Sequence, residues 1–212
     1  MARCLKPPAV FFAAIAAALA GAIAAGMPMR AQAQGQGQAQ AQAQALTYGL
    51  DPSHTQVTFE VLHLGTSTLR GRFNRIEGSA TLDRAARSGD VSVAIDTSSV
   101  STGVLPLDGL LRGPQGFASQ DHPKAYFTAR QLVFAGDKLA SLRGELTLKG
   151  ISLPLQMRAT NFNCYEHPVL KREVCGGDFE AELMRSAFGI SHSLPFVGDR
   201  VRLLVQVEGV RQ

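Results

Sequence analysis

The sequence lacks the short motifs that mark the common catalytic and nucleotide-binding sites. It contains no GxSxG nucleophile motif, no GxxxxGKS/T phosphate loop and no HExxH zinc motif. The segment Asp51-Pro52-Ser53-His54 has the residue types of a catalytic triad, but neighbouring residues of an extended chain point to opposite faces. We therefore interpret this segment as a turn that leads into a strand, and we predict a protein that is not an enzyme and uses no cofactor.

Charged side chains are also scarce, at 18% of the residues. The chain has 21 Lys and Arg against 17 Asp and Glu, but Arg3, Lys6 and Arg30 lie in an N-terminal segment that we expect to be removed. The remainder has 18 basic and 17 acidic residues, a balance that gives no support to nucleic-acid binding, which needs a basic stripe. The five histidines have no paired spacing typical of metal ligands. We expect neither a nucleic-acid partner nor a metal site.

The N-terminal segment is typical of a secretory signal peptide. Arg3 and Lys6 precede an apolar, alanine-rich run over residues 7–25, and Ala31-Gln32-Ala33 matches the small-x-small cleavage pattern. The alternative is an uncleaved membrane anchor, but a membrane span needs about 20 strongly apolar residues and this run is mostly alanine. We predict a signal peptide over residues 1–33 and a periplasmic mature protein. Residues 34–45, rich in Ala and Gln, are predicted to be a flexible linker before a domain of residues 46–212.

Cysteine is rare, with three in the chain. Cys4 lies in the signal segment, so Cys164 and Cys175 remain, on either side of a polar stretch that is typical of a hairpin loop. An even pair in an exported protein favours a disulfide. The alternative, a redox or metal-binding pair, has neither CxxC spacing nor further ligands nearby.

Alternation of apolar and polar residues dominates the domain and predicts β-strands. Residues expected to share one strand face are Val57, Phe59, Val61 and His63; Phe127 and Val133, with Tyr126 and Leu132 opposite; Phe179, Ala181, Leu183 and Arg185; and Val201, Leu203, Val205 and Val207. Gly and Asp favour tight turns. Among other places, we predict turns at Gly71, Gly78, Gly176-Gly177 and Val197-Gly198-Asp199. About eight strands with short connections favour an all-β fold, a closed antiparallel barrel.

One segment, residues 101–117, breaks the alternation. Its leucines do not follow a period of two, and Gly113-Pro114 is a stop signal. We predict a short helix near residues 104–112 that lies over one mouth of the barrel.

Polar side chains near this mouth have two interpretations. His63, His192, Arg112 and Arg185 could contact the head group of a ligand. They could instead be ordinary structural residues, namely histidines with a hydrogen-bond partner, or arginines that extend to solvent or pair with an acid such as Asp108. The sequence leaves both interpretations open.

Taken together, the motifs of the domain resemble the YceI-like, polyisoprenoid-binding family of exported bacterial proteins. They run nearly from end to end: DPSHTQVTFEVLHLG at 51–65, GRFNRIEGSATLD at 71–83, SSVSTG at 98–103, LLR at 110–112, HPKAYF at 122–127, GELTLKGISLPL at 144–155, RSAFGI at 185–190 and VGDRV at 197–201. The departures are Tyr48, where the family usually carries tryptophan, Gly113-Pro114, and the insert between Cys164 and Cys175.

The resemblance implies an eight-stranded lipocalin-like barrel whose elongated apolar cavity binds an isoprenoid lipid, such as the tail of a quinone or a polyprenyl lipid. It implies cavity or mouth positions at Phe59, Val61, His63, Phe73, Leu111, Arg112, Phe117, Phe127 and Phe188. We therefore predict a periplasmic carrier. Two alternatives are a non-enzymatic interaction module of an envelope redox or stress system, with a solid core, and an enzyme that acts on an isoprenoid. Transient membrane contact and dimerisation are left open.

Overall fold

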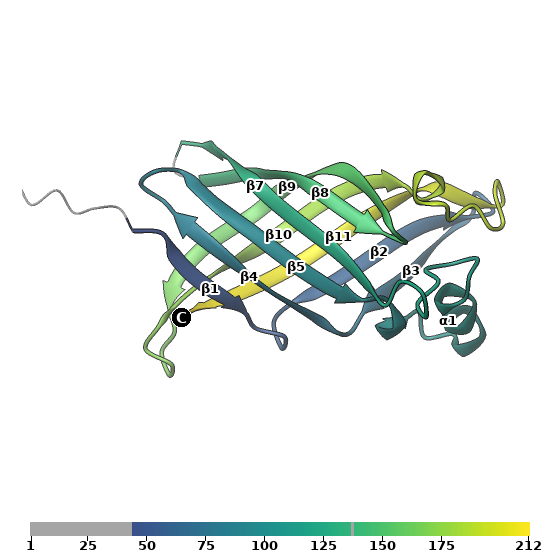
Figure 1. The fold of residues 1–212 in the computed structure, drawn as a ribbon, viewed down its shortest axis with the longest axis horizontal. Coiled ribbons are helices and arrows are strands. Elements are labelled where there is room, and N and C mark those ends of the chain that lie inside the picture. The colour runs from purple at the N-terminus through teal and green to yellow at the C-terminus, as the bar shows by residue number, and fades with distance from the viewer. Residues whose placement is uncertain (1–43, 137) are drawn as a thin grey trace, which may run out of the picture. The chain divides into compact units, whose positions relative to one another are not determined.

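Residues 44–136 and 138–212, which the computed structural model describes, form a closed β-barrel (Figure 1). The predicted signal peptide, residues 1–33, and residues 34–43 of the predicted linker lie outside the described residues. In chain order, the elements are β1 (Leu46–Leu50), β2 (Gln56–His63), β3 (Ser67–Phe73), β4 (Ile76–Asp83), β5 (Ser88–Asp96), η1 (Thr97–Ser99), β6 (Val100–Ser101), α1 (Leu105–Arg112), β7 (Lys124–Ala135), β8 (Lys138–Leu148), β9 (Ile151–Glu166), β10 (Glu173–Met184), η2 (Arg185–Phe188) and β11 (Val197–Arg211).

Eight strands close the barrel, in the order β1-β4-β5-β7-β8-β9-β10-β11, because β11 also pairs with β1. The strands β2 and β3 extend this ring. The C-terminal end of β11 pairs with β1, and the part from Val197 to Gln206 pairs with β2, which in turn pairs with β3. These pairings are antiparallel. Closure pairs the edges that a flat sheet would leave open, and it confirms the predicted eight-stranded, lipocalin-like barrel.

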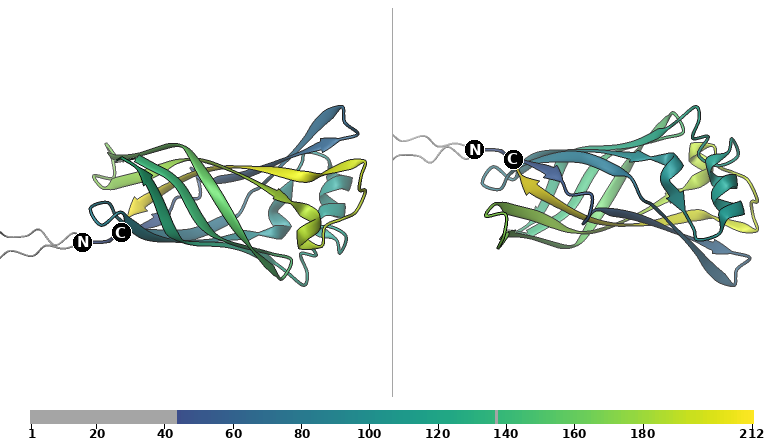
Figure 2. Two further views of the ribbon diagram at one scale, coloured as in Figure 1. Left: turned by 90° about the horizontal axis from the view of Figure 1, so that it is seen from above. Right: turned by 90° about the horizontal axis from the view of Figure 1, so that it is seen from below.

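One end of the barrel carries α1, η2 and the loop that follows η2, whereas the C-terminus lies at the other end (Figures 1 and 2). The helix α1 begins and ends within one residue of the predicted bounds. Asp108, which is 3% exposed, accepts hydrogen bonds from the backbone N–H (2.7 Å) and the hydroxyl (2.6 Å) of Thr102. This contact fastens the helix to the chain that enters it from β6. Within the described residues, no helix has the length and hydrophobicity needed to cross a bilayer.

The inward faces of the strands follow the predicted alternation in most places. Val57, Phe59 and Val61 are buried, and the residues between them face outward. The alternation fails at Leu132, which we expected on the face opposite Phe127 but which packs inside with it. A register shift between Ala129 and Gln131 is the cause, because a β-bulge inserts one residue and moves the following side chains to the other face.

Several predicted turns are wrong because their glycines lie inside strands. Gly71 belongs to β3, Gly78 to β4 and Gly176-Gly177 to β10. Gly71 faces inward opposite Phe59, and a Cβ atom there would lie 2.2 Å from Cζ of the Phe59 ring. Close packing, and not turn geometry, therefore explains why glycine occupies these positions. The segment Val197-Gly198-Asp199 begins β11 and has an irregular pairing with β2 instead of a turn.

The two cysteines form the predicted disulfide across the β9–β10 hairpin. Cys164 and Cys175 lie opposite each other in the strand register, with an S–S distance of 2.07 Å and a Cα–Cα distance of 4.1 Å. The disulfide lies at the end of the barrel away from α1. It packs in a small cluster that also contains Tyr48 and Leu82.

Candidate functional site

The interior of the barrel contains two cavities that adjoin along its axis. The inner cavity has a volume of about 130 Å³ and the outer cavity about 180 Å³. Val57, Ile95, Leu146 and Leu203 line both of them, so these four side chains surround the junction. Because strand residues alternate between the two faces, inward side chains from almost every strand contribute to the lining.

The inner cavity is lined by apolar side chains with few polar atoms. Phe127, Leu139, Leu142, Met157 and Phe179 surround it, and Tyr48 and Cys175 lie in its wall toward the end away from α1. A ligand in this cavity would gain free energy by burying its hydrocarbon, and it would make few directional polar contacts.

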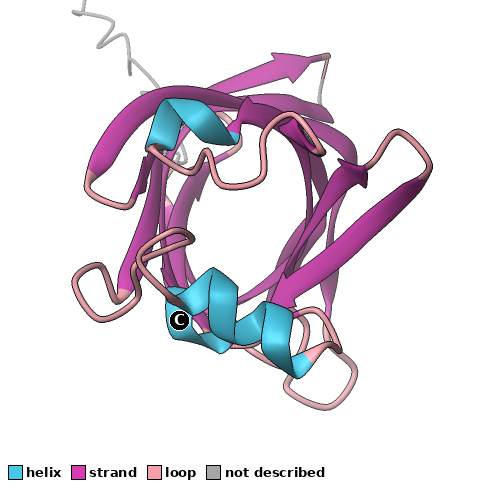
Figure 3. Ribbon diagram, turned by 90° about the vertical axis from the view of Figure 1, so that its right-hand side faces the viewer, coloured by secondary structure: helices cyan, strands magenta, loops and turns pink. Residues whose placement is uncertain are grey.

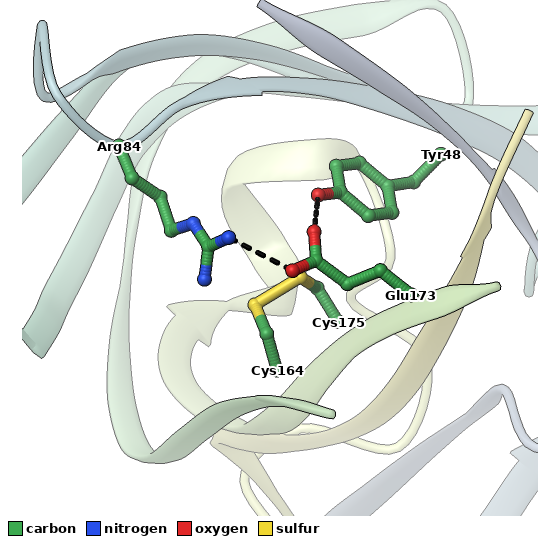
Figure 4. Close-up of a disulfide and its surroundings, with 5 residues drawn as sticks. All are labelled: Tyr48, Arg84, Cys164, Glu173 and Cys175. Carbon is green, nitrogen blue, oxygen red and sulfur yellow. Dashed lines mark hydrogen bonds and ion pairs between the residues drawn. A yellow bond between two sulfur atoms is a disulfide. The ribbon is translucent and has the colours of Figure 1, made fainter. Parts of the chain in front are cut away.

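A group of polar contacts lies beside the disulfide (Figure 4), and Tyr48 and Cys175 of this group line the inner cavity. The hydroxyl of Tyr48 donates a hydrogen bond to Glu173, whose other carboxylate oxygen lies 2.8 Å from Nη2 of Arg84. Burial of the phenol, aided by the hydrogen bond to Glu173, raises the pKa of Tyr48 to about 12. The neutral phenol, the ion pair and the disulfide thus join β1, β9, β10 and the β4–β5 turn at this end.

The outer cavity opens toward α1 and has a mixed lining. Phe59, Val61 and Phe73 come from the strands and Leu111 from α1, while Phe117 follows the helix. The ring centroids of Phe73 lie 5.9 Å from Phe59 and 5.3 Å from Phe117, within the range of favourable aromatic pairs. Polar groups appear here too, and they are Arg70, Thr102, Gln115, Arg185, His192 and Ser193.

Arg185 is the most buried charged group of this lining, at 8% exposure. Its guanidinium donates to the carbonyls of Gly198 (2.8 Å), Val197 (2.8 Å), Ile190 (2.9 Å) and His192 (3.0 Å). Four of its five N–H donors are therefore used by the backbone. Burial lowers the pKa of this group, although nearby Asp199 opposes the shift. Arg185 fixes the loop between η2 and β11 against the outer cavity.

Six of the nine site residues implied by the family resemblance line a cavity. Phe59, Val61, Phe73, Leu111 and Phe117 line the outer cavity, and Phe127 lines the inner one. His63, Arg112 and Phe188 line neither cavity. Phe188 is buried at 3% exposure in the main core, and His63 is half-buried at the end of β2. The guanidinium of Arg112 donates to the carbonyls of Ser98 (2.9 Å) and Val100 (3.0 Å), which ties α1 to η1 and β6.

Sequence reasoning did not single out several residues that line the outer cavity. They include Leu107 and Leu110 of α1, Leu183 of β10 and Ile190 of the loop. For Arg185 a signal was present, because it continues the inward face of Phe179, Ala181 and Leu183. An arginine on such a face must find buried acceptors.

The Asp51 segment forms a turn, as predicted, but the argument that kept Ser53 and His54 apart is wrong. In the turn, Oγ of Ser53 lies 3.1 Å from Nδ1 of His54, and the carboxylate of Asp51 contacts both, at 2.6 Å and 2.8 Å. A catalytic triad needs the acid and the nucleophile on different imidazole nitrogens. Here both contacts use Nδ1. The contact with Ser53, followed by that with His54, lowers the pKa of Asp51 to about 2, and the group lines neither cavity.

The described part of the chain contains no group of three or more His, Cys, Asp or Glu that could hold a metal ion.

Comparison with known proteins identifies the family. The model of the YceI-like domain matches residues 48–209, nearly the whole barrel. The chain belongs to the YceI-like family. A relative named UPF0312 protein, from Pseudomonas aeruginosa, is 35% identical over 171 residues, which cover 79% of this chain and 88% of the relative.

Two solved structures have the same fold. BcnA of Burkholderia cenocepacia matches with a TM-score of 0.62 at 19% identity, over 75% of this chain and 98% of that chain. A polyisoprenoid-binding domain from Saccharophagus degradans, implicated in plant cell wall breakdown, matches with a TM-score of 0.57 at 17% identity, over 79% and 99%.

Proposed function

We propose that this protein is a periplasmic carrier that holds the long isoprenoid chain of a quinone or polyprenyl lipid inside the barrel. The observation that supports this most directly is the pair of adjoining apolar cavities along the barrel axis. Membership of the YceI-like family adds support, since one solved structure of this fold is described as a polyisoprenoid-binding domain.

The length of the lining fits a chain of several isoprene units. On the part of β11 that follows its irregular pairing with β2, lining residues run from Val201 to Gly209, which is roughly 26 Å along the strand and about 20 Å along the axis of a barrel with strands tilted by about 40°. An isoprene unit adds four bonds of about 1.5 Å to an extended chain and so advances it by about 5 Å. The two cavities together therefore suit about four units.

Hydrophobic burial supplies most of the expected affinity. Transfer of apolar carbon from water contributes about 0.8 kcal/mol per methylene, so a five-carbon unit contributes roughly 2–4 kcal/mol before costs. Micromolar binding requires about 8 kcal/mol. Four buried units contribute roughly 8–16 kcal/mol, so the upper part of this range still gives micromolar binding after the cost of ordering the chain.

The distribution of polar groups favours a tail-first orientation. At the inner end, Tyr48 and Arg84 are already engaged with Glu173, and the disulfide lies beside them. The outer cavity, by contrast, has Gln115, His192 and Ser193 in its lining. A polar head group would lie at the outer end, where these side chains add orientation.

A carrier agrees better with the cavities than an interaction module does, because such a module would need no internal space and could fill it with side chains. The polar groups of the outer cavity include a buried arginine whose donors are largely used by backbone carbonyls. Binding without chemical conversion is therefore the function we assign.

The test is organic extraction of protein purified from its own envelope, followed by mass spectrometry of the extract. We expect a co-purified lipid with an isoprenoid chain. Extract without such a lipid, combined with no binding of added ubiquinone or polyprenol, would contradict the proposal.

The periplasmic location has a separate test. A disulfide within the barrel agrees with an oxidising compartment. The intact mass of the exported protein should correspond to a chain that starts after Ala33 and carries the Cys164–Cys175 bond. A mass that retains Met1 would contradict the processing.

A further inference from the structure

Large apolar side chains are exposed around the outer end of the barrel. Leu62 and Leu64 lie on the β2–β3 hairpin, Val104, Leu105 and Leu110 lie at or on α1, and Phe196 lies in the loop before β11. We call these six residues the apolar rim. Leu105 is 81% exposed, Phe196 65% and Leu64 57%. Exposure of several large apolar side chains in one region is typical of an interaction site.

The segments of the apolar rim gather around the outer cavity. The backbone N–H of Leu64 donates to the carbonyl of Phe196 at 2.7 Å, which joins the hairpin to the loop. Seen along the barrel axis, the helical segments lie around the end of the ring of strands (Figure 3). Leu110 lines the outer cavity and is also 41% exposed, so apolar surface continues from the cavity to the outside of the molecule.

These segments are almost without charge. Residues 62–67, 102–120 and 186–198 contain two residues that are charged at neutral pH, Asp108 and Arg112. The carboxylate of Asp108 is engaged by Thr102, and the guanidinium of Arg112 donates to two backbone carbonyls. The nearby Lys149 also uses its ammonium on carbonyls, those of Pro114 (2.8 Å) and Gly189 (3.2 Å).

The connections at the other end of the barrel carry more charge. Its β4–β5 and β9–β10 connections contain Arg84, Arg87, Lys171 and Arg172, and Glu173 begins β10. The segments of the apolar rim thus carry fewer charges than these connections, where Val169 and Leu170 are also exposed. A partner that binds the apolar rim must itself be apolar and electrically neutral where it makes contact.

We propose that the apolar rim inserts into the interfacial region of a lipid bilayer, so that the outer cavity opens toward the lipid. This proposal rests on the proposed function. An isoprenoid resides in the bilayer, and a rim that enters the bilayer lets it move into the cavity without crossing water. A protein surface of ordinary composition would leave its charged groups without partners on this rim, whereas hydrocarbon needs none. The helix α1 contributes Leu105 and Leu110 to the apolar rim, and its residues Leu107, Leu110 and Leu111 line the outer cavity.

The experiment measures partition of the protein onto vesicles of zwitterionic phosphatidylcholine that contain no isoprenoid. The protein is obtained by expression of the full chain, so the variants share the N-terminus of the wild type. Leu105→Ser with Phe196→Ser removes two rim side chains that line neither cavity. We expect this double variant to lower the partition coefficient by about tenfold or more. Each substitution removes the favourable free energy of transferring an apolar side chain from water to lipid.

A matched control changes apolar residues at the other end. Val169 and Leu170, in the β9–β10 connection, are 80% and 46% exposed. We expect Val169→Ser with Leu170→Ser to bind vesicles within about twofold of the wild type. Partition of the wild type should also change little between low and high salt, since the rim binds through apolar contacts.

Three outcomes overturn the proposal: no vesicle binding by the wild type, equal losses in the rim and control variants, or loss of binding at high salt. A fourth outcome comes from ultracentrifugation without vesicles. The proposal is also overturned if the wild type is a dimer that the rim substitutions dissociate while vesicle binding is unchanged. Binding of farnesol in solution separates this proposal from the proposed function. If the wild type binds farnesol but not vesicles, docking is refuted and the carrier function remains.

Discussion

The junction between the two cavities permits a direct test of how a ligand lies in the barrel. Val57 lines both cavities, is 5% exposed and lies on β2 between Phe73 of β3 and Val205 of β11. Substitution of Val57 by tryptophan would place an indole ring across the passage. Overpacking of a core lowers the free energy of unfolding by about 1–3 kcal/mol. Because the adjoining cavities leave space for the ring, we expect the barrel to remain folded.

The expected loss of affinity depends on chain length. Inner-cavity residues on β11 run from Leu203 to Gly209, roughly 20 Å of strand or about 15 Å of axis. About three isoprene units would lose this space, and each contributes roughly 2–4 kcal/mol before costs. Even if ordering costs remove half of that energy, Val57→Trp should weaken binding of a ubiquinone with eight isoprene units by at least about a hundredfold. A ubiquinone with one unit fits in the outer cavity, and its affinity should change by less than about fivefold.

The assay uses the absence of tryptophan from the chain. The variant therefore carries a single tryptophan, and quenching of its fluorescence by the quinone reports binding. The matched control is Thr58→Trp, because Thr58 is the next residue of β2 and faces away from both cavities. An emission maximum at shorter wavelength for the indole at position 57 would verify that it lies inside the barrel. If this variant binds the eight-unit ubiquinone as tightly as the control does, the chain does not pass Val57 and the tail-first interpretation is refuted.

Three further predictions concern the contacts that hold the ends of the barrel. Replacement of Cys164 and Cys175 by serine should lower the free energy of unfolding by about 2–3 kcal/mol, measured by urea denaturation, and an unchanged midpoint would contradict this. Arg185→Met should lower the free energy of unfolding by at least about 3 kcal/mol, because four carbonyls lose a charged donor. Arg112→Met affects two carbonyls and should lower the free energy of unfolding by less. Equal losses in the two variants would count against the reasoning. The pKa of Tyr48 is raised to about 12 in the fold, from about 10 in an unfolded chain, so its contribution, on the order of 2 kcal/mol, should be complete below pH 10 and lost as the pH rises toward 12. Tyr48→Phe should remove this part of the pH dependence, and denaturation curves of both proteins at alkaline pH would decide the matter.

Much of the fold could be predicted from the sequence because strand alternation is a local property. Val57, Phe59 and Val61 are every second residue of one strand, so they share a face, and this apolar face is expected to point into the core. The same holds for the cysteines, whose pairing across a hairpin follows from a short connection. It also holds for α1, which ends at Arg112, directly before the stop signal at Gly113. The family resemblance then supplied six positions that line the cavities.

Tertiary structure alone decided the remaining features. Alternation assigns a side chain to a face but not to a position along the barrel axis, so it could not tell that Val57 and Leu203 surround the junction of two cavities. A bulge that reverses the face, as at Leu132, depends on pairing with a distant strand. Arg112 and Arg185 look alike in sequence, each after apolar residues, yet Arg112 ties α1 to β6 and Arg185 lines the outer cavity. The physical reason is that local sequence sets the direction of a side chain, whereas its neighbours are set by closure of the barrel.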